Sequence, residues 1–490
     1  MSDQGAVEAR ASTGVPGLDE ILHGGLIAGR NYLVRGGPGS GKTTLGVHFL
    51  RVGEPANNLF VTLGETAEQL RDNAHRSGLP LDVVPILDAS PVDAEGGSEQ
   101  AYNLLESWEV EGGTVHDRIV EYARNHAPQR VFIDSLTQLR YLTPDGYQFR
   151  KQVLSLLRQL TANGATVMFT SEIGAAGSDD DLQFLADGVI HLTRTDGGRV
   201  CTVSKMRGSG FFEGGHHYAV GDGGMVIYPR LVPEEHNRAF AQESIGSGIA
   251  AVDKLTGGGI ERGTVTVLSG PSGVGKSTFG AHFMQEAAKR GERSVIYGFD
   301  EGRATFEHRL ARIGMPIQEM LESGALAFEY IEPMSYNPDR FALLVRDAVE
   351  RRGVRVVMLD SLSGYRQSIP GKEMGTRIHE LTRYLVNMGV TVILVNEVKS
   401  IVAQEPRATD DGVSYLADTI ILLRYMEAEG ELRKSVGVLK KRTSDFEKSV
   451  RAFDITEDGI RVGEPMRGVL GGAGGGADRF APAGAGHGVD

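Results

Sequence analysis

Two glycine-rich segments of the chain share one pattern of residues. Residues 36–43 have the sequence GGPGSGKT and residues 270–277 have GPSGVGKS, so both fit G-x-x-x-x-G-K-[ST]. Glycines let backbone N–H groups curve around phosphate oxygens, the lysine reaches the β- and γ-phosphates, and the final hydroxyl binds Mg²⁺. The residues predicted to bind ATP are Gly39, Ser40, Gly41, Lys42, Thr43 and Thr44 in the first copy, and Gly273, Val274, Gly275, Lys276, Ser277 and Thr278 in the second.

An apolar run that ends in aspartate follows each of these segments. The first run is VFID, ending at Asp134, and the second is VVMLD, ending at Asp360. The carboxyl end of a parallel strand lies on the ligand side of its sheet, where a carboxylate holds Mg²⁺ through the water shell of the ion. The predicted metal ligands are therefore Thr43 and Asp134 in the first copy, and Ser277 and Asp360 in the second.

Hydrolysis also needs a group that orients or deprotonates water. The segments LGET and FDEG occupy matching positions, so the paired acids Asp300 and Glu301 correspond to Gly64 and Glu65. For Glu65, a solvated acid at a helix N-terminus is a serious alternative to a catalytic role. The predicted catalytic residues are Lys42 and Glu65 in the first copy, and Lys276, Asp300 and Glu301 in the second.

Positive charge at each site could come from a neighbouring subunit. The segment SKMRG matches LKKRT, which pairs Lys205 with Lys440 and Arg207 with Arg442. A K-x-R sequence at the end of a strand usually lies at a solvated edge of the sheet. Because the sequence occurs in both copies, a functional role and a solvated edge are about equally supported here. Arg140 and Arg366, each six residues after a predicted metal ligand, are further candidates for an arginine finger.

The elements around these residues are also present twice. Matching blocks recur in the same order at a nearly constant offset, which indicates domain duplication rather than a short solenoid repeat. Short apolar runs alternate with longer amphipathic stretches, the pattern of an α/β fold with a mostly parallel sheet covered on both faces. In the first copy the expected helices are 43–52, 67–77, 114–126 and 149–163.

The repeats predict three parts of the chain. Residues 1–235 form the first domain, residues 236–467 the second, and residues 468–490 a glycine- and alanine-rich tail that we expect to be disordered. Together with the two phosphate-binding segments, the tail accounts for part of the high content of 66 glycines among 490 residues.

Composition narrows the class of protein. The single cysteine, Cys201, excludes an intrachain disulfide and a multi-cysteine metal site. No apolar run is long enough to span a bilayer, and no signal-peptide pattern is found at the N-terminus, so we expect a soluble cytoplasmic protein without a membrane partner. The formal net charge of −13 argues against nucleic acid as a main partner.

These motifs together resemble the RecA-like ATPases, and most closely the KaiC family. The resemblance includes GLDEILHGGLIAGR, GPGSGKT, LDASP, FIDS, SKMRG and DTIILL, and covers nearly the whole chain. It implies two tandem RecA-like P-loop domains, a homohexameric double ring, ATP and Mg²⁺ between subunits, and a KaiB-like or other signalling protein as partner. Lys205, Arg207, Lys440, Arg442 and Arg366 would then contact the neighbour's ATP.

The resemblance also implies an autokinase in the second domain, acting on two adjacent hydroxyls before the DTIILL strand. At that place the second copy has Ser414 and Tyr415, whereas the first has Gln183 and Phe184. Ser414 is the better candidate phosphosite, because the family's second acceptor is usually threonine and is Tyr415 here. Thr409 matches a further family hydroxyl.

The resemblance has one consequence for the first domain. One of the family's paired acids is replaced by Gly64, so we expect slow or altered hydrolysis there. The overall expectation is a ring-shaped signalling ATPase that autophosphorylates on serine, a serine/threonine kinase activity. A DNA-dependent motor of the RecA type and a nucleotide-gated scaffold with little turnover remain the alternatives.

Overall fold

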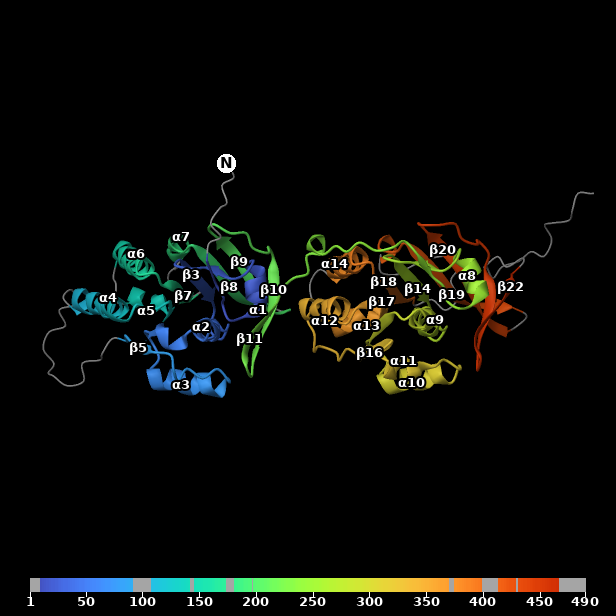
Figure 1. Cartoon of the computed structure of the whole chain (residues 1–490), viewed down its shortest axis with the longest axis horizontal. Coiled ribbons are helices and arrows are strands. Elements are labelled where there is room, and N and C mark those ends of the chain that lie inside the picture. The colour runs from blue at the N-terminus through green and yellow to red at the C-terminus, as the bar shows by residue number, and fades with distance from the viewer. Residues whose placement is uncertain are drawn as a thin grey trace, which may run out of the picture. The chain divides into compact units, whose positions relative to one another are not determined.

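The computed structural model describes residues 9–90, 107–141, 145–172, 180–195, 197–369, 374–398, 413–428 and 431–466. Thr409 and the tail 468–490 lie outside these ranges. The chain separates into two compact units, one built mainly from Met1–Leu231 and the other mainly from the residues after it (Figure 1). This division falls beside the boundary at residue 235 that the repeats predict, and the domain boundaries themselves remain predictions.

The first unit contains a nine-stranded sheet in the order β11-β10-β9-β8-β3-β7-β6-β4-β5. The pairs from β8 to β5 are parallel, and those from β8 to β11 are antiparallel. Its strands are β3 (Asn31–Gly36), β4 (Asn58–Thr62), β5 (Ile86–Asp88), β6 (Arg130–Asp134), β7 (Thr166–Glu172), β8 (Gly188–Thr195), β9 (Gly198–Met206), β10 (Gly215–Gly221) and β11 (Gly224–Tyr228), with a separate pair β1 (Arg10–Ala11) and β2 (Leu26–Ile27).

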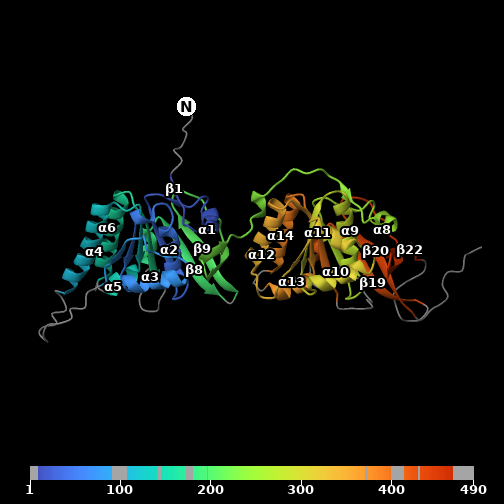
Figure 2. The ribbon, with the colours of Figure 1, turned by 60° about the horizontal axis from the view of Figure 1, so that its bottom comes forward.

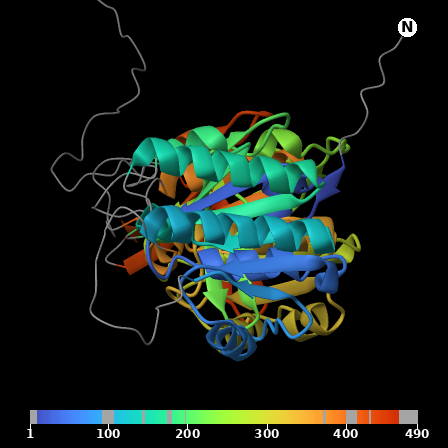
Figure 3. The same cartoon turned by 90° about the vertical axis from the view of Figure 1, so that its left-hand side faces the viewer.

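Helices cover both faces of this sheet (Figures 1 and 2). One apolar core packs α1 (Pro16–Ile21), α2 (Lys42–Leu50) and α3 (Ala67–Arg76) against the strands. The core of the other face contains α4 (Ser107–His126), α5 (Leu136–Tyr141), α6 (Gly146–Ala162) and α7 (Asp181–Leu185). Figure 3 shows α4 and α6 side by side, where Arg124 Nη2 donates to Gln159 Oε1 over 3.1 Å. The helix predicted at 114–126 is α4, which begins earlier than expected, at Ser107.

The second unit repeats this sheet in the order β16-β15-β17-β18-β14-β19-β20-β21-β22. The pairs from β16 to β19 are parallel and the last three are antiparallel, as in the first unit. Its strands are β14 (Val265–Gly270), β15 (Arg293–Gly298), β16 (Leu326–Tyr330), β17 (Val354–Asp360), β18 (Thr391–Glu397), β19 (Thr419–Ala428), β20 (Glu431–Lys441), β21 (Arg451–Thr456) and β22 (Gly459–Pro465), with a separate pair β12 (Ser244–Ile245) and β13 (Ile260–Glu261).

The helices of the second unit follow the same plan. One face carries α8 (Ala250–Leu255), α9 (Lys276–Lys289), α10 (Arg303–Ala311) and α11 (Ile317–Glu322) around a single apolar core. Two further helices of this unit are α13 (Leu362–Ser368), which contacts β17 and β18, and α14 (Met374–Asn387), which contacts β18. Helix α12 (Pro338–Glu350) is divided between the two units, since Asn337–Val345 cluster with the first. Among the described residues, 3₁₀ turns lie at η1 (Pro55–Asn57) in the first unit and at η2 (Pro233–Glu235) and η3 (Val413–Tyr415) in the second.

The shared strand order and helix placement confirm the predicted fold class. Each unit is a mostly parallel sheet flanked by helices, and together they form two tandem RecA-like domains. The buried strands are almost continuously apolar, because a parallel sheet is covered on both faces.

Candidate nucleotide-binding sites

Each glycine-rich segment connects a central strand to the helix that follows it. Gly41 and Gly275 precede α2 and α9 with φ angles of 93° and 113°, a left-handed conformation that side-chain-bearing residues rarely adopt. The next residue begins the helix, so the loop N–H groups and the helix N-terminus face the same space. This geometry fits an anionic phosphate.

The two lysines of these segments lie in equivalent positions. Lys42 Nζ donates to Gly36 O at 2.8 Å, and Lys276 Nζ donates to Gly270 O at 2.9 Å and to Pro271 O at 2.8 Å. Burial lowers the pKa of the Lys276 ammonium, and the carboxylates of Glu397 and Asp360 oppose part of this shift. Both ammonium groups are buried, so an anionic ligand that displaced the loop carbonyls would meet a poorly solvated cation.

Hydroxyl and carboxylate oxygens lie close together at the N-terminal ends of α2 and α9. In the first site Asp134 accepts hydrogen bonds from Thr43 Oγ1 and from Thr170 Oγ1, both over 2.6 Å. In the second site Asp360 accepts one from Ser277, whereas burial raises the pKa of the Asp360 carboxyl. Oxygen donors of this kind are the ligands that Mg²⁺ prefers, so the predicted ligand pairs fit that ion.

Sheet register brings a further glutamate to each site. Glu172 pairs with Gly36 across β7 and β3, and Glu397 pairs with Gly270 across β18 and β14. Glu397 lines the second site directly. Sequence reasoning aligned these segments without singling out either glutamate, although their equal position in both copies was a usable signal.

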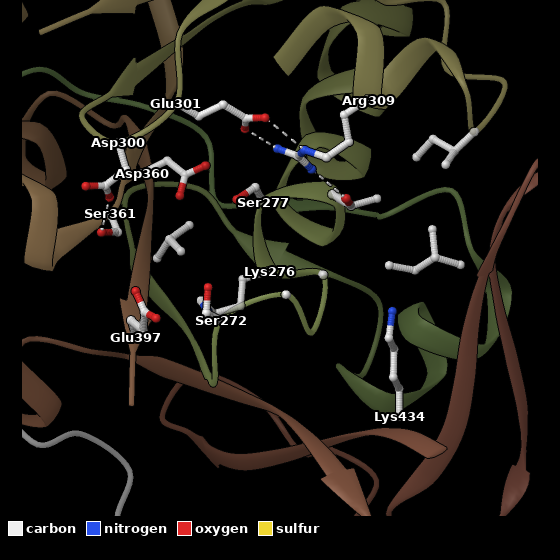
Figure 4. Close-up of a pocket in the computed structure, with 16 residues that line it drawn as sticks. Ser272, Lys276, Ser277, Asp300, Glu301, Arg309, Asp360, Ser361, Glu397 and Lys434 are labelled. Carbon is white, nitrogen blue, oxygen red and sulfur yellow. Dashed lines mark hydrogen bonds and ion pairs between the residues drawn. The ribbon is translucent and has the colours of Figure 1, made fainter. Parts of the chain in front are cut away.

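The second site is a cavity of about 480 Å³. It is lined by Ser272, Gly273, Gly275, Lys276, Ser277, Thr278, Asp300, Glu301, Arg309, Ile313, Asp360, Ser361, Val395, Glu397, Lys434 and Ile455. Figure 4 shows the acids Asp300, Glu301 and Asp360 on one side of Ser277, with Arg309 close to Glu301. The structure therefore brings the predicted ATP-binding residues of the second copy, except Val274, together with its candidate metal ligands and candidate catalytic residues.

The paired acids of this cavity have different partners. Asp300 Oδ2 accepts a hydrogen bond from Ser361 Oγ over 2.8 Å. Glu301 is paired with the guanidinium of Arg309, whose Nη2 lies 2.7 Å from Glu301 Oε2. Arg309 was not predicted from the sequence, because an arginine on an amphipathic helix is usually a solvated residue.

The first site has a smaller cavity of about 160 Å³ beside its phosphate-binding segment. Thr43, Thr44, Glu65 and Asn73 contribute polar groups to its lining. Glu65 Oε2 accepts a hydrogen bond from Asn73 Nδ2 over 3.3 Å, and Gly64 is exposed. This cavity therefore brings Glu65 close to Thr43 and Thr44, whereas Lys42 and Asp134 do not line it. Gly64 stands where the second site has the carboxylate of Asp300.

The lysines of the two K-x-R segments donate hydrogen bonds to backbone oxygens of their own domain. Lys205 Nζ donates to Gln183 O and Ala186 O, over 2.9 and 2.6 Å. Lys440 Nζ donates to Ser414 O and Ala417 O in the same way, over 3.1 and 2.7 Å. Both lysines thus hold the segment that precedes the last parallel strand of their own domain. Their contact with a neighbouring subunit remains a prediction.

The candidate arginines also have positions within their own domains. Arg207 Nη1 lies 3.5 Å from Asp187 Oδ1, and Arg442 Nη1 lies 3.6 Å from Asp418 Oδ1. The guanidinium of Arg140 lies 5.5 Å from the ring centre of Phe149. Arg366 is half-buried in α13.

The two candidate phosphosites lie in η3, just before β19. Ser414 is half-buried, whereas Tyr415 is exposed and its ring lies 6.0 Å from that of His379. Phe184, the residue that matches Tyr415, is exposed as well. The segment before the last parallel strand is thus α7 in the first copy and η3 in the second, and the two segments have different side chains at the matching positions.

Comparison with known proteins adds two findings. The family model of the KaiC ATPase matches residues 11–232 and 245–467. The chain is 27% identical to the circadian clock oscillator protein KaiC of Picosynechococcus sp., over 95% of this chain and 92% of that protein. It is 28% identical to KaiC of Synechococcus elongatus, over 94% and 90%, and 28% identical to KaiC3 of Synechocystis sp., over 94% and 93%.

Within the described ranges, no helix is both long and apolar enough to cross a membrane. The duplicated sheet, the two phosphate-binding segments at equivalent strand ends and the match of the family model over both halves agree with one another. The chain belongs to the KaiC family of ATPases.

Proposed function

We propose that this protein binds Mg²⁺·ATP at both sites, hydrolyses it faster at the second, and transfers phosphate to its own Ser414. One observation carries the proposal: the second cavity gathers Lys276, Ser277 and Asp360 with the acid pair of residues 300 and 301. Phosphoryl transfer needs charge stabilisation and a positioned proton acceptor more than covalent chemistry, and these are the groups that supply both.

Each residue has a definite task in this proposal. The Lys276 ammonium balances charge on the β- and γ-phosphates, while the N–H groups from residue 273 to residue 278 surround them. Ser277 and Asp360 would hold Mg²⁺, which neutralises the developing phosphate charge. Asp300, aligned by Ser361, accepts the proton of the attacking hydroxyl or water. Lys42, Thr43, Asp134 and Glu65 have the corresponding roles in the first site.

In the autokinase step, the Oγ of Ser414 forms a bond to the γ-phosphorus as the bond to the β–γ bridging oxygen breaks. ADP leaves, and the hydroxyl proton passes to the carboxylate of Asp300. Lys440 supports this assignment, since it anchors the backbone oxygen of Ser414. Only the second copy has a hydroxyl at this turn, so the first copy is proposed to hydrolyse ATP without self-phosphorylation.

The proposal includes a ring of identical subunits. Arg207 and Arg442 lie on exposed strand ends, at side-chain exposures of 56% and 54%, where a neighbour's phosphate could be reached. A guanidinium supplied from the next subunit stabilises transition-state charge in many NTPases. Homo-oligomerisation, most simply as a hexamer, would complete both sites.

Incubation with γ-labelled ATP tests the autokinase part. We expect label on the wild-type protein and on Tyr415→Phe, and no label on Ser414→Ala or Lys276→Ala. Peptide mapping should place the label at residue 414. Unchanged labelling of Ser414→Ala would reject this acceptor, and an unlabelled wild type that still releases phosphate would reduce the proposal to ATP hydrolysis.

A further inference from the structure

The guanidinium of Arg309 joins two parts of the second site. Its Nη2 lies 2.7 Å from Glu301 Oε2 and its Nε lies 3.3 Å from Glu301 Oε1, a two-point contact. Its Nη1 donates to Thr278 Oγ1 over 2.9 Å. Figure 4 shows these contacts at the edge of the cavity. One side chain of α10 therefore connects the acid pair with the first turn of α9.

The neighbours of these contacts explain why the connection matters. Thr278 directly follows Ser277, a proposed metal ligand, and Glu301 directly follows Asp300. Both oxygens of Glu301 are engaged by Arg309, whereas Asp300 is oriented by the neutral hydroxyl of Ser361. Charge-assisted two-point contacts fix geometry more strongly than single neutral hydrogen bonds.

The first site provides an internal comparison. Asn73 stands eight residues after Glu65, as Arg309 stands eight after Glu301, and Thr44 matches Thr278. The hydrogen bond from Asn73 to Glu65 is a single one, comes from a neutral amide and is 3.3 Å long. Of these two matching positions, 73 and 309, only position 309 has an arginine.

We propose that Arg309 is a positioning residue of the second site. It holds Glu301 against the phosphate-loop helix, so that Glu301 is withheld from proton transfer and Asp300 keeps a fixed place beside the reacting phosphate. This inference rests on the proposed function of the cavity in ATP turnover. It assigns to Glu301 a structural task that the sequence pattern alone does not separate from catalysis.

The same contacts also fit a role in holding α10 to the fold and nothing more. The side chains of Arg309 and Glu301 are 36% and 30% exposed, and ion pairs this accessible contribute little to folding stability. Arg309→Asn should therefore fold, and its effect should appear in turnover. A variant that only loosened the fold would lower the thermal midpoint instead.

The experiment uses the full chain with Lys42→Ala, so that only the second site turns over. ATP hydrolysis is measured in this parent, in Arg309→Asn and in Arg309→Lys. Arg303→Asn is the matched control, because it removes an exposed Arg303–Glu307 pair on the same helix, outside the cavity. Thermal midpoints are recorded for all variants.

We expect kcat of Arg309→Asn to fall roughly tenfold, as small misplacements of catalytic groups have effects of this order or larger. KM should change by less than about threefold, since binding of the ground state is largely kept. Arg309→Lys should recover part of the loss, and Arg303→Asn should equal the parent.

Three results would overturn the inference. One is an unchanged kcat in Arg309→Asn, another is a loss confined to KM, and the third is a fall in kcat that follows a fall in thermal midpoint. If the Lys42→Ala parent itself hydrolyses no ATP, the proposed function of the second site fails first, and the inference fails with it.

Discussion

Gly364 lies directly against the carboxylate of Asp300. A Cβ atom at position 364 would come within 2.6 Å of both Asp300 Oδ2 and Phe299 Cβ and within 2.8 Å of Asp300 Oδ1, closer than real contacts allow. The matching position of the first domain, also the fourth residue after the metal-ligand aspartate, is Gln138, and it faces Gly64. The two sites thus differ at both positions: the second has Asp300 next to Gly364, and the first has Gly64 next to Gln138.

This contact predicts the effect of Gly364→Ala. The new methyl group would displace Asp300 from its bond to Ser361, so second-site hydrolysis should fall by roughly tenfold or more. The measurement is phosphate release in the Lys42→Ala background. The same substitution with Lys276→Ala, where only the first site works, should leave the rate unchanged. Equal rates for Gly364→Ala and its parent would show that Asp300 has no part in turnover.

The reverse exchange should strengthen the first site. A Cβ at Gly64 would meet only Gln138 Nε2, at 4.0 Å, so Gly64→Asp combined with Gln138→Gly fits sterically. With Lys276→Ala as background, we expect the double variant to hydrolyse ATP several times faster than its parent, a small part of the roughly 100-fold or larger gain that a well-positioned general base brings. A rate at or below that of the parent would argue that Gly64 does not limit this site.

Burial of Asp360 predicts a stability effect that depends on pH. Burial raises the pKa of this carboxyl above its ordinary value of 3.8, so the fold disfavours the ionised form. The cost is absent below the ordinary value and complete above the folded-state pKa. Without nucleotide and Mg²⁺, Asp360→Asn should therefore raise the thermal midpoint at pH 7, with a gain that shrinks on acidification.

Asp134→Asn is the control for that prediction. Asp134 accepts hydrogen bonds from Thr43 and Thr170, so its replacement should bring no gain at pH 7. A lower midpoint for Asp360→Asn at neutral pH, or a gain that grows toward acid, would contradict the assignment.

Ring assembly predicts complementation between subunits. In the Lys42→Ala background, Lys276→Ala lacks the phosphate-binding lysine and Arg442→Ala lacks the group proposed to act in the next subunit, so each should be inactive alone. A mixture reassembled with ATP should regain roughly a quarter of the parental rate, because one neighbour pair in four combines the two intact groups. Light scattering should show the same assembly for both variants. No regain in mixed rings would place Arg442 outside the neighbour's site.

Sequence reasoning reached the parts of the site that follow from local pattern. Lys276 and Ser277 are specified by a loop whose glycines and helix start are contiguous, and Asp360 by the strand that precedes it. The fold class followed from the duplicated alternation of apolar runs and helices. Patterns of this kind depend on neighbours along the chain, which a single sequence displays.

Contacts that depend on strand register or on packing between helices could not be predicted from the sequence. Glu397 enters the site only because β18 pairs with β14 beside Gly270. Arg309 of α10 contacts both Glu301 and Thr278 of α9, and Gly364 of α13 lies next to Asp300. Lys440 was predicted for a neighbour's ATP, whereas in the single chain its ammonium holds Ser414 O. Distances of this kind come from three-dimensional packing, which the sequence pattern does not specify.

We propose that the chain has two separate ATPase sites and that the second turns over faster than the first. Steady-state phosphate release from ATP in the wild type, Lys42→Ala, Lys276→Ala and the double variant measures the share of each site. We expect Lys276→Ala to lose most of the activity, Lys42→Ala to lose a smaller part, and the double variant to lose all of it. Wild-type turnover in the double variant, or loss of nearly all activity in Lys42→Ala alone, would contradict the claim.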